Sequence, residues 1–309
     1  MLNFGGETMG TRWRVHCVVP PGSSETELRR AAEAELDRAV ALFSHWEPSS
    51  ELGRFNAAPP GPFAASPAFL RLIGESLAFA ERTGGAVDPT LGVLVDLWGF
   101  GPPGPRPDGR APSLEEIERA RIDSGWRRLT FDGPGGLIVQ PGGLRLDLSG
   151  LAKGWAVDQV SSALTTLGAT HHLVEIGGEL VGRGIKPDGQ PWWVEIEAPA
   201  AGSRTLAALF DLAVATSGDG ERRADFGGRI HGHTIDGRTG RPTDPTVASV
   251  TVFAETAFEA DAWATALTVL GSEGPARAER EGLAALFTLR SASGLAERTT
   301  AALKAMLEA

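Results

Sequence analysis

The order of the predicted helices and strands is the feature that most constrains the fold. Apolar residues recur at helical spacing in residues 25–43 and 67–85, after Ser149 and in residues 257–270. Short segments of strand character lie before and between these helices. Because helices and strands do not alternate strictly, we expect an α+β fold with mixed or antiparallel sheets and packed helices.

The 309 residues are enough for one large domain or two modest ones. We interpret residues 1–309 as a single domain. The stretch 99–112, "GFGPPGPRPDGRAP", is rich in proline and glycine and is expected to be a loop or a hinge, too stiff for a flexible linker. The run at 205–216, "TLAALFDLAVAT", is interpreted as a hairpin.

Composition excludes several classes of function. The formal net charge of −10 argues against a broad nucleic-acid surface and against docking on anionic lipid. Cys17 is the single cysteine, so intramolecular disulfides and thiolate metal clusters are excluded. No apolar run approaches the roughly 18 residues of a membrane span.

The N-terminal sequence, "MLNFGGETMGTRWRV", lacks the layout of a signal peptide. The chain as written is therefore expected in the cytoplasm. A chain trimmed of an export signal would look the same, and would then belong in the periplasm or on a membrane anchor.

The stretch "LDLSGLAKGWAVD" at 146–158 places Asp147, a Ser-Gly corner and Lys153 close together. A helix that begins at this corner would point free N–H groups and the positive end of its dipole outward. Small residues let a ligand approach the backbone, so the corner suits a phosphorylated ligand. The alternative is an ordinary helix start whose lysine is solvated.

Asp261 and Thr265 are four residues apart on a predicted helix, so their side chains share one face. A carboxylate and a hydroxyl are hard oxygen ligands that suit Mg²⁺, with positions left for phosphate oxygens and waters. The alternative is a solvated aspartate beside a threonine that bonds back to helix carbonyls.

Two histidines, His231 and His233, lie two apart on a predicted strand and would face the same side. Such a pair can bind zinc, but without a third ligand we favour one histidine that faces a ligand and one that is structural. Asp88 lies in a Pro-containing corner that is either a turn or a ligand contact. Trp46 follows a helix and either stacks on an aromatic ligand or belongs to the core or its rim.

Fragments in a fixed order along the chain resemble the FAD:protein FMN transferase (ApbE) family. They run from Thr8 to about Leu267, nearly the whole chain. The matching fragments are "TMGTRWRV", "FSHWEPSSELGRFN", "DPTLGVLVDLWGFG", "LDLSGLAKGWAVD", "LVEIGGELVGRG", "LAVATSGD", "HTIDGRTGRP" and "ASVTVFAETAFEADAWATAL".

This resemblance implies a T-fold-like ApbE architecture with an FAD cleft between two lobes. It also implies an Mg²⁺-dependent enzyme that cleaves FAD, attaches FMN through a phosphoester to a Thr or Ser of an acceptor flavoprotein, and releases AMP. An FAD pyrophosphatase that yields FMN and AMP is the first alternative. A flavin-binding protein without chemistry is the second.

The resemblance also assigns residues. It implies that the metal is held by Asp261, Thr265 and the backbone carbonyl of Gly150. Asp261, His233 and Lys153 are the candidate catalytic residues, with His233 as the candidate base. The implied FAD contacts are Met9, Trp46, Val87, Asp88, Asp147, Lys153, His233 and Ile235.

Overall fold

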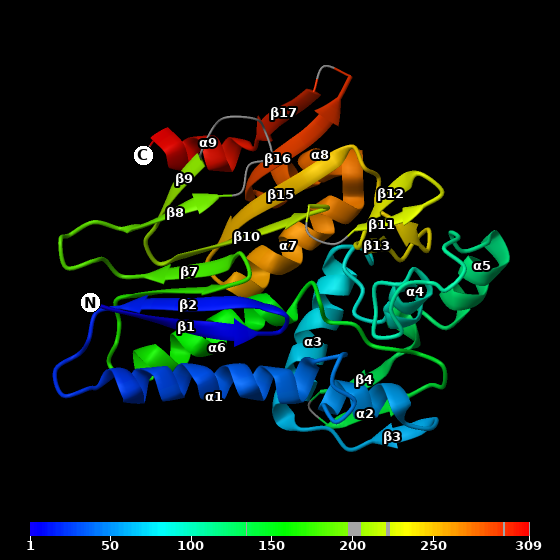
Figure 1. Ribbon diagram of the computed structural model, residues 1–309, viewed down its shortest axis with the longest axis horizontal. Coiled ribbons are helices and arrows are strands. Elements are labelled where there is room, and N and C mark those ends of the chain that lie inside the picture. Colours follow the sequence, from blue (N-terminus) through cyan, green and yellow to red (C-terminus); the bar gives the residue numbers. More distant parts are fainter. Residues whose placement is uncertain (134, 197–204, 221–222, 293, 309) are drawn as a thin grey trace.

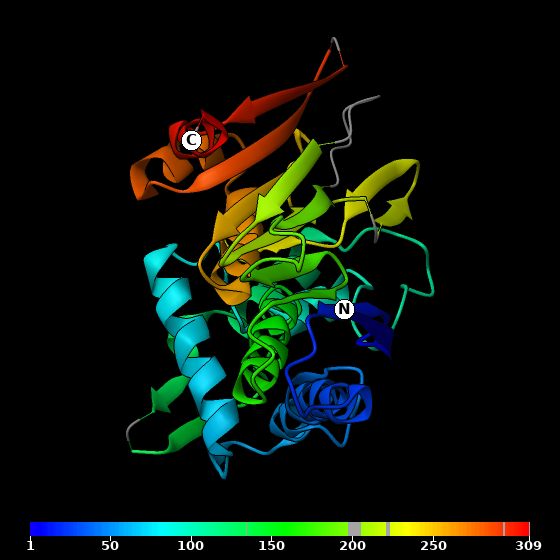
Figure 2. The same ribbon diagram turned by 90° about the vertical axis from the view of Figure 1, so that its left-hand side faces the viewer.

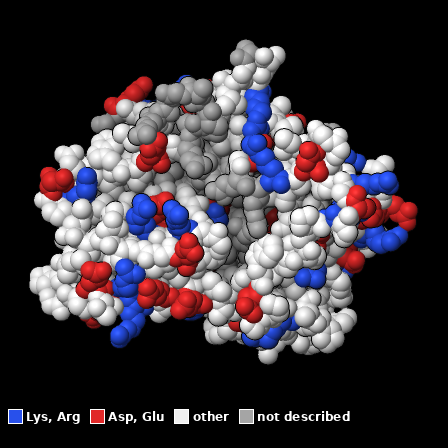
Figure 3. All heavy atoms as spheres, in the orientation of Figure 1, with Lys and Arg blue, Asp and Glu red and all other residues white. Residues whose placement is uncertain are grey.

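The computed structural model describes residues 1–133, 135–196, 205–220, 223–292 and 294–308 (Figure 1). Its helices and antiparallel sheets confirm the predicted α+β class. No helix within these ranges is long and apolar enough to cross a membrane. On the face drawn in Figure 3, acidic and basic side chains are interspersed.

The centre of the fold is an eight-stranded sheet in the order β1-β2-β6-β7-β10-β15-β16-β17, with every neighbouring pair antiparallel. The alternation along β2 is typical: Trp13, Val15 and Cys17 are buried against the helices, while the residues between them face outward. The strands are β1 (Leu2–Thr8), β2 (Thr11–Cys17), β6 (His172–Ile176), β7 (Glu179–Arg183), β10 (Leu212–Gly218), β15 (Val247–Ala254), β16 (Ala284–Ser291) and β17 (Gly294–Thr299).

Three helices cover one face of this sheet: α1 (Glu25–Phe43), α6 (Ala152–Thr166) and α7 (Ala257–Leu270) (Figures 1 and 2). Helix α6 packs between α1 and α7, and α7 crosses β10 and β15. Helix α7 is apolar on most sides because it is enclosed by the sheet and by other helices.

The opposite face of the sheet carries a ribbon of β8 (Trp192–Ile196) and β9 (Thr205–Leu209). The predicted hairpin at 205–216 is therefore wrong, because β9 pairs with β8 while β10 pairs with β7 and β15. Asp211, in a left-handed conformation with φ of 49°, lies where the chain leaves one layer for the other. Trp192 and Leu209 pack in an apolar cluster on the outer face of the sheet, which explains why the ribbon stacks there.

The remaining elements surround this framework. The segment 99–112 is a loop between α4 (Gly92–Leu97) and α5 (Leu114–Ile122), and its residue Phe100 joins Trp98 in a separate apolar cluster. The other helices are α2 (Glu51–Ala57), α3 (Pro67–Arg82), α4 (Gly92–Leu97), α5 (Leu114–Ile122), α8 (Gly274–Glu281) and α9 (Ala301–Glu308). The other strands are β3 (Gly61–Phe63), β4 (Thr130–Asp132), β5 (Leu137–Gln140), β11 (Arg223–Phe226), β12 (Arg229–Gly232), β13 (Ile235–Asp236) and β14 (Arg241–Pro242).

Candidate active site

A cleft of about 760 Å³ opens where the β6–β7 turn and the end of β10 meet the first turn of α6. Its wall contains most of the residues that the sequence singled out: Val87, Asp88, Asp147, Gly150, Lys153, His233, Ile235, Asp261 and Thr265. Two predicted FAD contacts, Met9 and Trp46, are not among the described residues that line it. Met9 lies in the turn between β1 and β2, and Trp46 is 49% exposed with its ring 5.2 Å from that of His45.

Oxygen atoms from two distant segments meet in this cleft. Asp261 is only 4% exposed, and its Oδ2 accepts a hydrogen bond from the Gly154 N–H at 3.0 Å. Thr265 lies one turn further along α7, and a Cβ on Gly150 would come within 2.9 Å of its Oγ1. The carboxylate, the hydroxyl and the corner at Gly150 are therefore neighbours, as the sequence interpretation requires.

The close contact between α6 and α7 depends on Gly154. A Cβ at this position would lie 2.3 Å from the Ala257 carbonyl oxygen and 2.8 Å from the Asp261 Cβ. Only a glycine lets the first turn of α6 approach α7 this closely. The sequence motif Ala-Lys-Gly thus has a structural reason: it brings Gly150 to the face of α7 that carries Asp261 and Thr265.

The donor set fits a hard divalent cation. Within the described ranges, no group of three or more His, Cys, Asp and Glu side chains is arranged to hold a metal, so a cation here needs mixed oxygen donors. Among the described residues, no backbone N–H donates to the Gly150 carbonyl oxygen. Burial raises the pKa of Asp261, against the opposing effects of Lys153 and the Gly154 N–H. A bound cation would favour the ionised form of this carboxylate.

The first turn of α6 differs from the sequence expectation of free N–H groups that point outward. The Ala152 N–H donates to the Leu148 carbonyl at 2.8 Å, and the Gly154 N–H is taken by Asp261. Positive charge at this end of the cleft comes instead from the side chain of Lys153, which is 28% exposed.

Lys153 is held by a residue that the sequence interpretation missed. Its Nζ lies 2.6 Å from Oε1 of Glu179, which is 2% exposed and is the first residue of β7. Burial raises the pKa of Glu179 to about 8, and the nearby charge of Asp261 acts in the same direction, while Lys153 opposes both. Glu179 lies in the fragment "LVEIGGELVGRG" that carries the family resemblance, but nothing local in the sequence marks its side chain as part of the site.

Two of the acidic residues predicted for the site stabilise turns of the backbone. Asp147 Oδ1 accepts hydrogen bonds from the Ser149 hydroxyl and from the Ser149 N–H at 2.8 Å, which fixes the corner before α6. Asp88 accepts from the Thr90 N–H at 2.9 Å and from the Trp126 N–H at 3.1 Å. Burial raises the pKa of Asp88, and these hydrogen bonds counteract that effect. Asp88 thus stabilises a turn that forms part of the cleft wall.

The two histidines of the predicted strand lie in different surroundings. Strand β12 ends at Gly232 and β13 begins at Ile235, so the argument from strand alternation does not apply. The ring of His231 packs 5.4 Å from Trp98. His233 lines the cleft with its ring 6.4 Å from that of Phe100. The interpretation of one ligand-facing and one structural histidine therefore agrees better with the geometry than a zinc pair.

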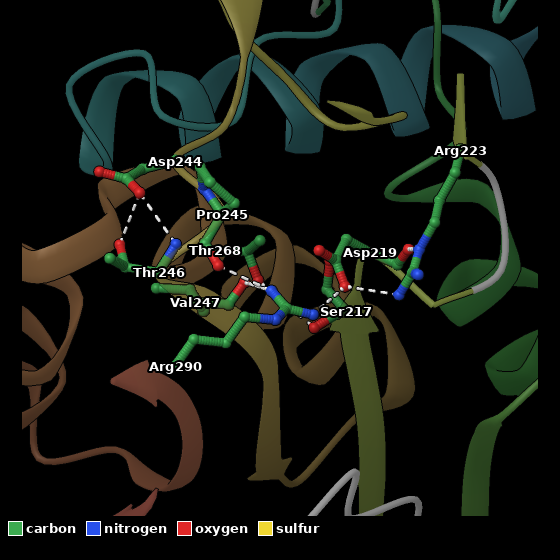
Figure 4. A network of polar contacts seen from close by, with 9 residues as sticks. All are labelled: Ser217, Asp219, Arg223, Asp244, Pro245, Thr246, Val247, Thr268 and Arg290. Atoms are coloured by element: carbon green, nitrogen blue, oxygen red, sulfur yellow. Dashed lines mark hydrogen bonds and ion pairs between the residues drawn. The ribbon is translucent and has the colours of Figure 1, made fainter. Parts of the chain in front are cut away.

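At the far end of the cleft, two arginines converge on Asp219 (Figure 4). Arg290 Nη2 lies 2.7 Å and Arg223 Nη2 lies 3.3 Å from Asp219 Oδ1. Arg290 also donates to the Pro245 carbonyl at 2.7 Å, which ties β16 to the segment before β15. Asp219 and Arg223 are four residues apart, but the approach of Arg290 from β16 could not be predicted from the sequence because it lies about 70 residues further along the chain.

Comparisons with known proteins agree with these features. Residues 9–287 match the profile of the ApbE family. An FAD:protein FMN transferase of Vibrio cholerae is 36% identical over 99% of this chain and 92% of its own length. The apo crystal structure of the Pseudomonas stutzeri flavinyl transferase ApbE superposes with a TM-score of 0.91 at 36% identity, covering 100% of this chain and 97% of the other. The Thermotoga maritima ApbE protein gives a TM-score of 0.89 at 30% identity, with 98% of each chain covered.

Proposed function

Since this chain belongs to the ApbE family, we propose that it is an Mg²⁺-dependent FAD:protein FMN transferase. It takes FAD as its substrate, attaches FMN through a phosphoester to a Thr or Ser hydroxyl of an acceptor flavoprotein, and releases AMP. The observation that carries the proposal is the meeting of Asp261, Thr265 and the Gly150 corner beside Lys153 in one cleft.

The chemistry asks for positioning and charge neutralisation more than for covalent help. Asp261, Thr265 and the Gly150 carbonyl would hold the cation, which when bound neutralises charge on the pyrophosphate oxygens. The ammonium of Lys153, which is fixed at the cleft wall, donates hydrogen bonds to the same phosphates. The acceptor oxygen forms a bond to the FMN phosphorus as the bond from that phosphorus to the AMP oxygen breaks.

The proton of the acceptor hydroxyl must leave during this transfer. His233 lines the cleft and is the proposed base, since an imidazole can accept a proton near neutral pH. The other proposed FAD contacts are those that the family resemblance implies, namely Met9, Trp46, Val87 and Ile235. Asp88 and Asp147 contribute mainly through the turns that they stabilise.

Transfer and hydrolysis need the same site and differ only in the nucleophile. Incubation with FAD, Mg²⁺ and a candidate acceptor domain, followed by denaturing electrophoresis, separates them. A fluorescent acceptor band with an equal amount of AMP supports the transferase. Free FMN with AMP and an unlabelled acceptor indicates a pyrophosphatase, and intact FAD indicates a binding protein.

A further inference from the structure

Glu179 is a buried carboxylate to which the proposed reaction assigns no role. It lines the cleft, is 2% exposed, and places Oε1 2.6 Å from the ammonium of Lys153. Its second oxygen, Oε2, is buried and has no hydrogen-bond partner among the described residues. Burying a carboxylate in this way costs free energy of folding, which suggests that Glu179 has a function at the cleft.

The β6–β7 hairpin determines where this side chain points. Gly177 and Gly178 have φ of 59° and 98°, as a two-residue turn of the type that matches strand twist requires. Ile176 and Glu179 are direct cross-strand partners, so both side chains face the helix layer. Ile176 is fully buried there. The register therefore brings the carboxylate of Glu179 under the first turn of α6.

The position of Lys153 makes this contact consequential. A lysine side chain has a flexible stem of four carbons and loses much conformational freedom when its ammonium is held in one place. The ion pair with Glu179 fixes the ammonium at the cleft wall in advance, in the same cleft as Asp261. A preorganised cation contributes more to catalysis than one that must be ordered during the reaction.

We propose that Glu179 is a positioning residue, which holds the Lys153 ammonium where it meets the phosphates of FAD. The inference rests on the proposed function for the identity of the ligand. Glu179 does not touch the substrate and acts through Lys153 alone.

A double-mutant cycle tests this dependence. The cycle is measured above pH 8, where Glu179 is ionised. Glu179→Gln then keeps the shape and loses the charge, and Lys153→Met keeps much of the length and loses the ammonium. We expect Glu179→Gln to weaken FAD binding without metal and to lower kcat/KM, each about tenfold, a typical loss for a charged hydrogen bond. In the Lys153→Met background the same change is expected to have an effect below about twofold, because its partner is gone.

Controls separate positioning from general stability. Glu118→Gln breaks an ion pair of 2.9 Å with Arg121 on exposed α5 and is expected to leave FAD binding and kcat/KM unchanged. Thermal unfolding checks that each variant folds. If Glu179→Gln does not fold, Glu179→Asp, which keeps the charge and withdraws it by one methylene, takes its place in the cycle.

The outcomes are distinct. An equal effect of the Glu179 variant with and without Lys153, or no effect in the wild-type background, overturns the positioning role. If the wild-type protein cleaves FAD but labels no acceptor, the transferase proposal fails. FAD affinity measured by flavin fluorescence still decides the role of Glu179 in that case.

Discussion

Asp158 and Asp261 each cap the helix that carries the other. Asp158 of α6 accepts hydrogen bonds from the Ala257 and Phe258 N–H groups of α7, both at 2.9 Å, and Asp261 of α7 accepts one from the Gly154 N–H of α6 at 3.0 Å. Asp261 lines the cleft, whereas Asp158 is not among the described residues of its wall. Two carboxylates with the same structural task thus differ in their relation to the site.

This pair gives a matched test of the role of Asp261. Asp158→Asn and Asp261→Asn are each expected to lower the free energy of unfolding by about 1 kcal/mol, as cap substitutions do. Only Asp261→Asn should abolish Mg²⁺-dependent cleavage of FAD, with a loss beyond the roughly 10–100-fold seen when groups behind metal ligands are changed. Urea denaturation and the rate of AMP release measure the two effects. Full activity of Asp261→Asn in Mg²⁺ would remove this residue from the mechanism.

Lys153→Ala is expected to weaken FAD binding and to lower kcat/KM by about 10–100-fold, the range for a lost hydrogen bond to a charged group. The fold should persist because the side chain is partly exposed. Flavin fluorescence titration and steady-state kinetics measure the two effects. Unchanged values for both would remove Lys153 from FAD binding and from the reaction.

Gly154→Ala is expected to destabilise the protein by about 1–3 kcal/mol, the usual cost of overpacking. The added methyl would meet the Ala257 carbonyl oxygen at 2.3 Å, and neither helix backbone can move without disturbing the sheet contacts. Gly220→Ala is the control, since nothing lies within 4 Å of a Cβ there, and its effect should stay within about 0.5 kcal/mol. Equal stability of both variants would contradict the close approach of α6 and α7.

His172 predicts a pH dependence of stability. It is fully buried, with Nε2 2.7 Å from Ser161 Oγ and Nδ1 2.7 Å from the Ala169 carbonyl, and burial lowers its pKa from the ordinary 6.5. Below that pH the unfolded chain binds a proton that the folded protein does not, so the free energy of unfolding falls as the pH drops.

Urea denaturation of wild type and His172→Gln between pH 8 and 5 tests this effect. The variant should be less stable at pH 8, where the neutral histidine keeps its hydrogen bonds, but its stability should fall less toward pH 5. Parallel profiles would show that His172 contributes nothing to the pH dependence.

The sequence predicted the helices well where local signals agree. The bounds of α1 and α7 match the expected helices at 25–43 and 257–270. It also identified Asp261 and Thr265 as neighbours, because four-residue spacing on a helix fixes relative position. Their approach to Gly150 came only from the family resemblance, since nothing local reveals which helices touch.

The missed features all depend on tertiary contacts. Strands β9 and β10 were read as a hairpin because the layer to which each strand belongs is decided by distant partners. The roles of Glu179 and Asp158 could not be predicted because a single acidic residue forms no recognisable sequence motif. His233 was placed on a strand that ends one residue earlier, at Gly232.

The most direct test of the account is to locate the cation itself. Crystals of the protein soaked with FAD and Mn²⁺, a substitute for Mg²⁺ that scatters anomalously, reveal the bound ion by its anomalous signal. We expect a peak bounded by the carboxylate of Asp261, the hydroxyl of Thr265 and the carbonyl of Gly150, next to the phosphates of FAD. A peak elsewhere in the cleft, or FAD bound with its phosphates away from Asp261, would contradict it.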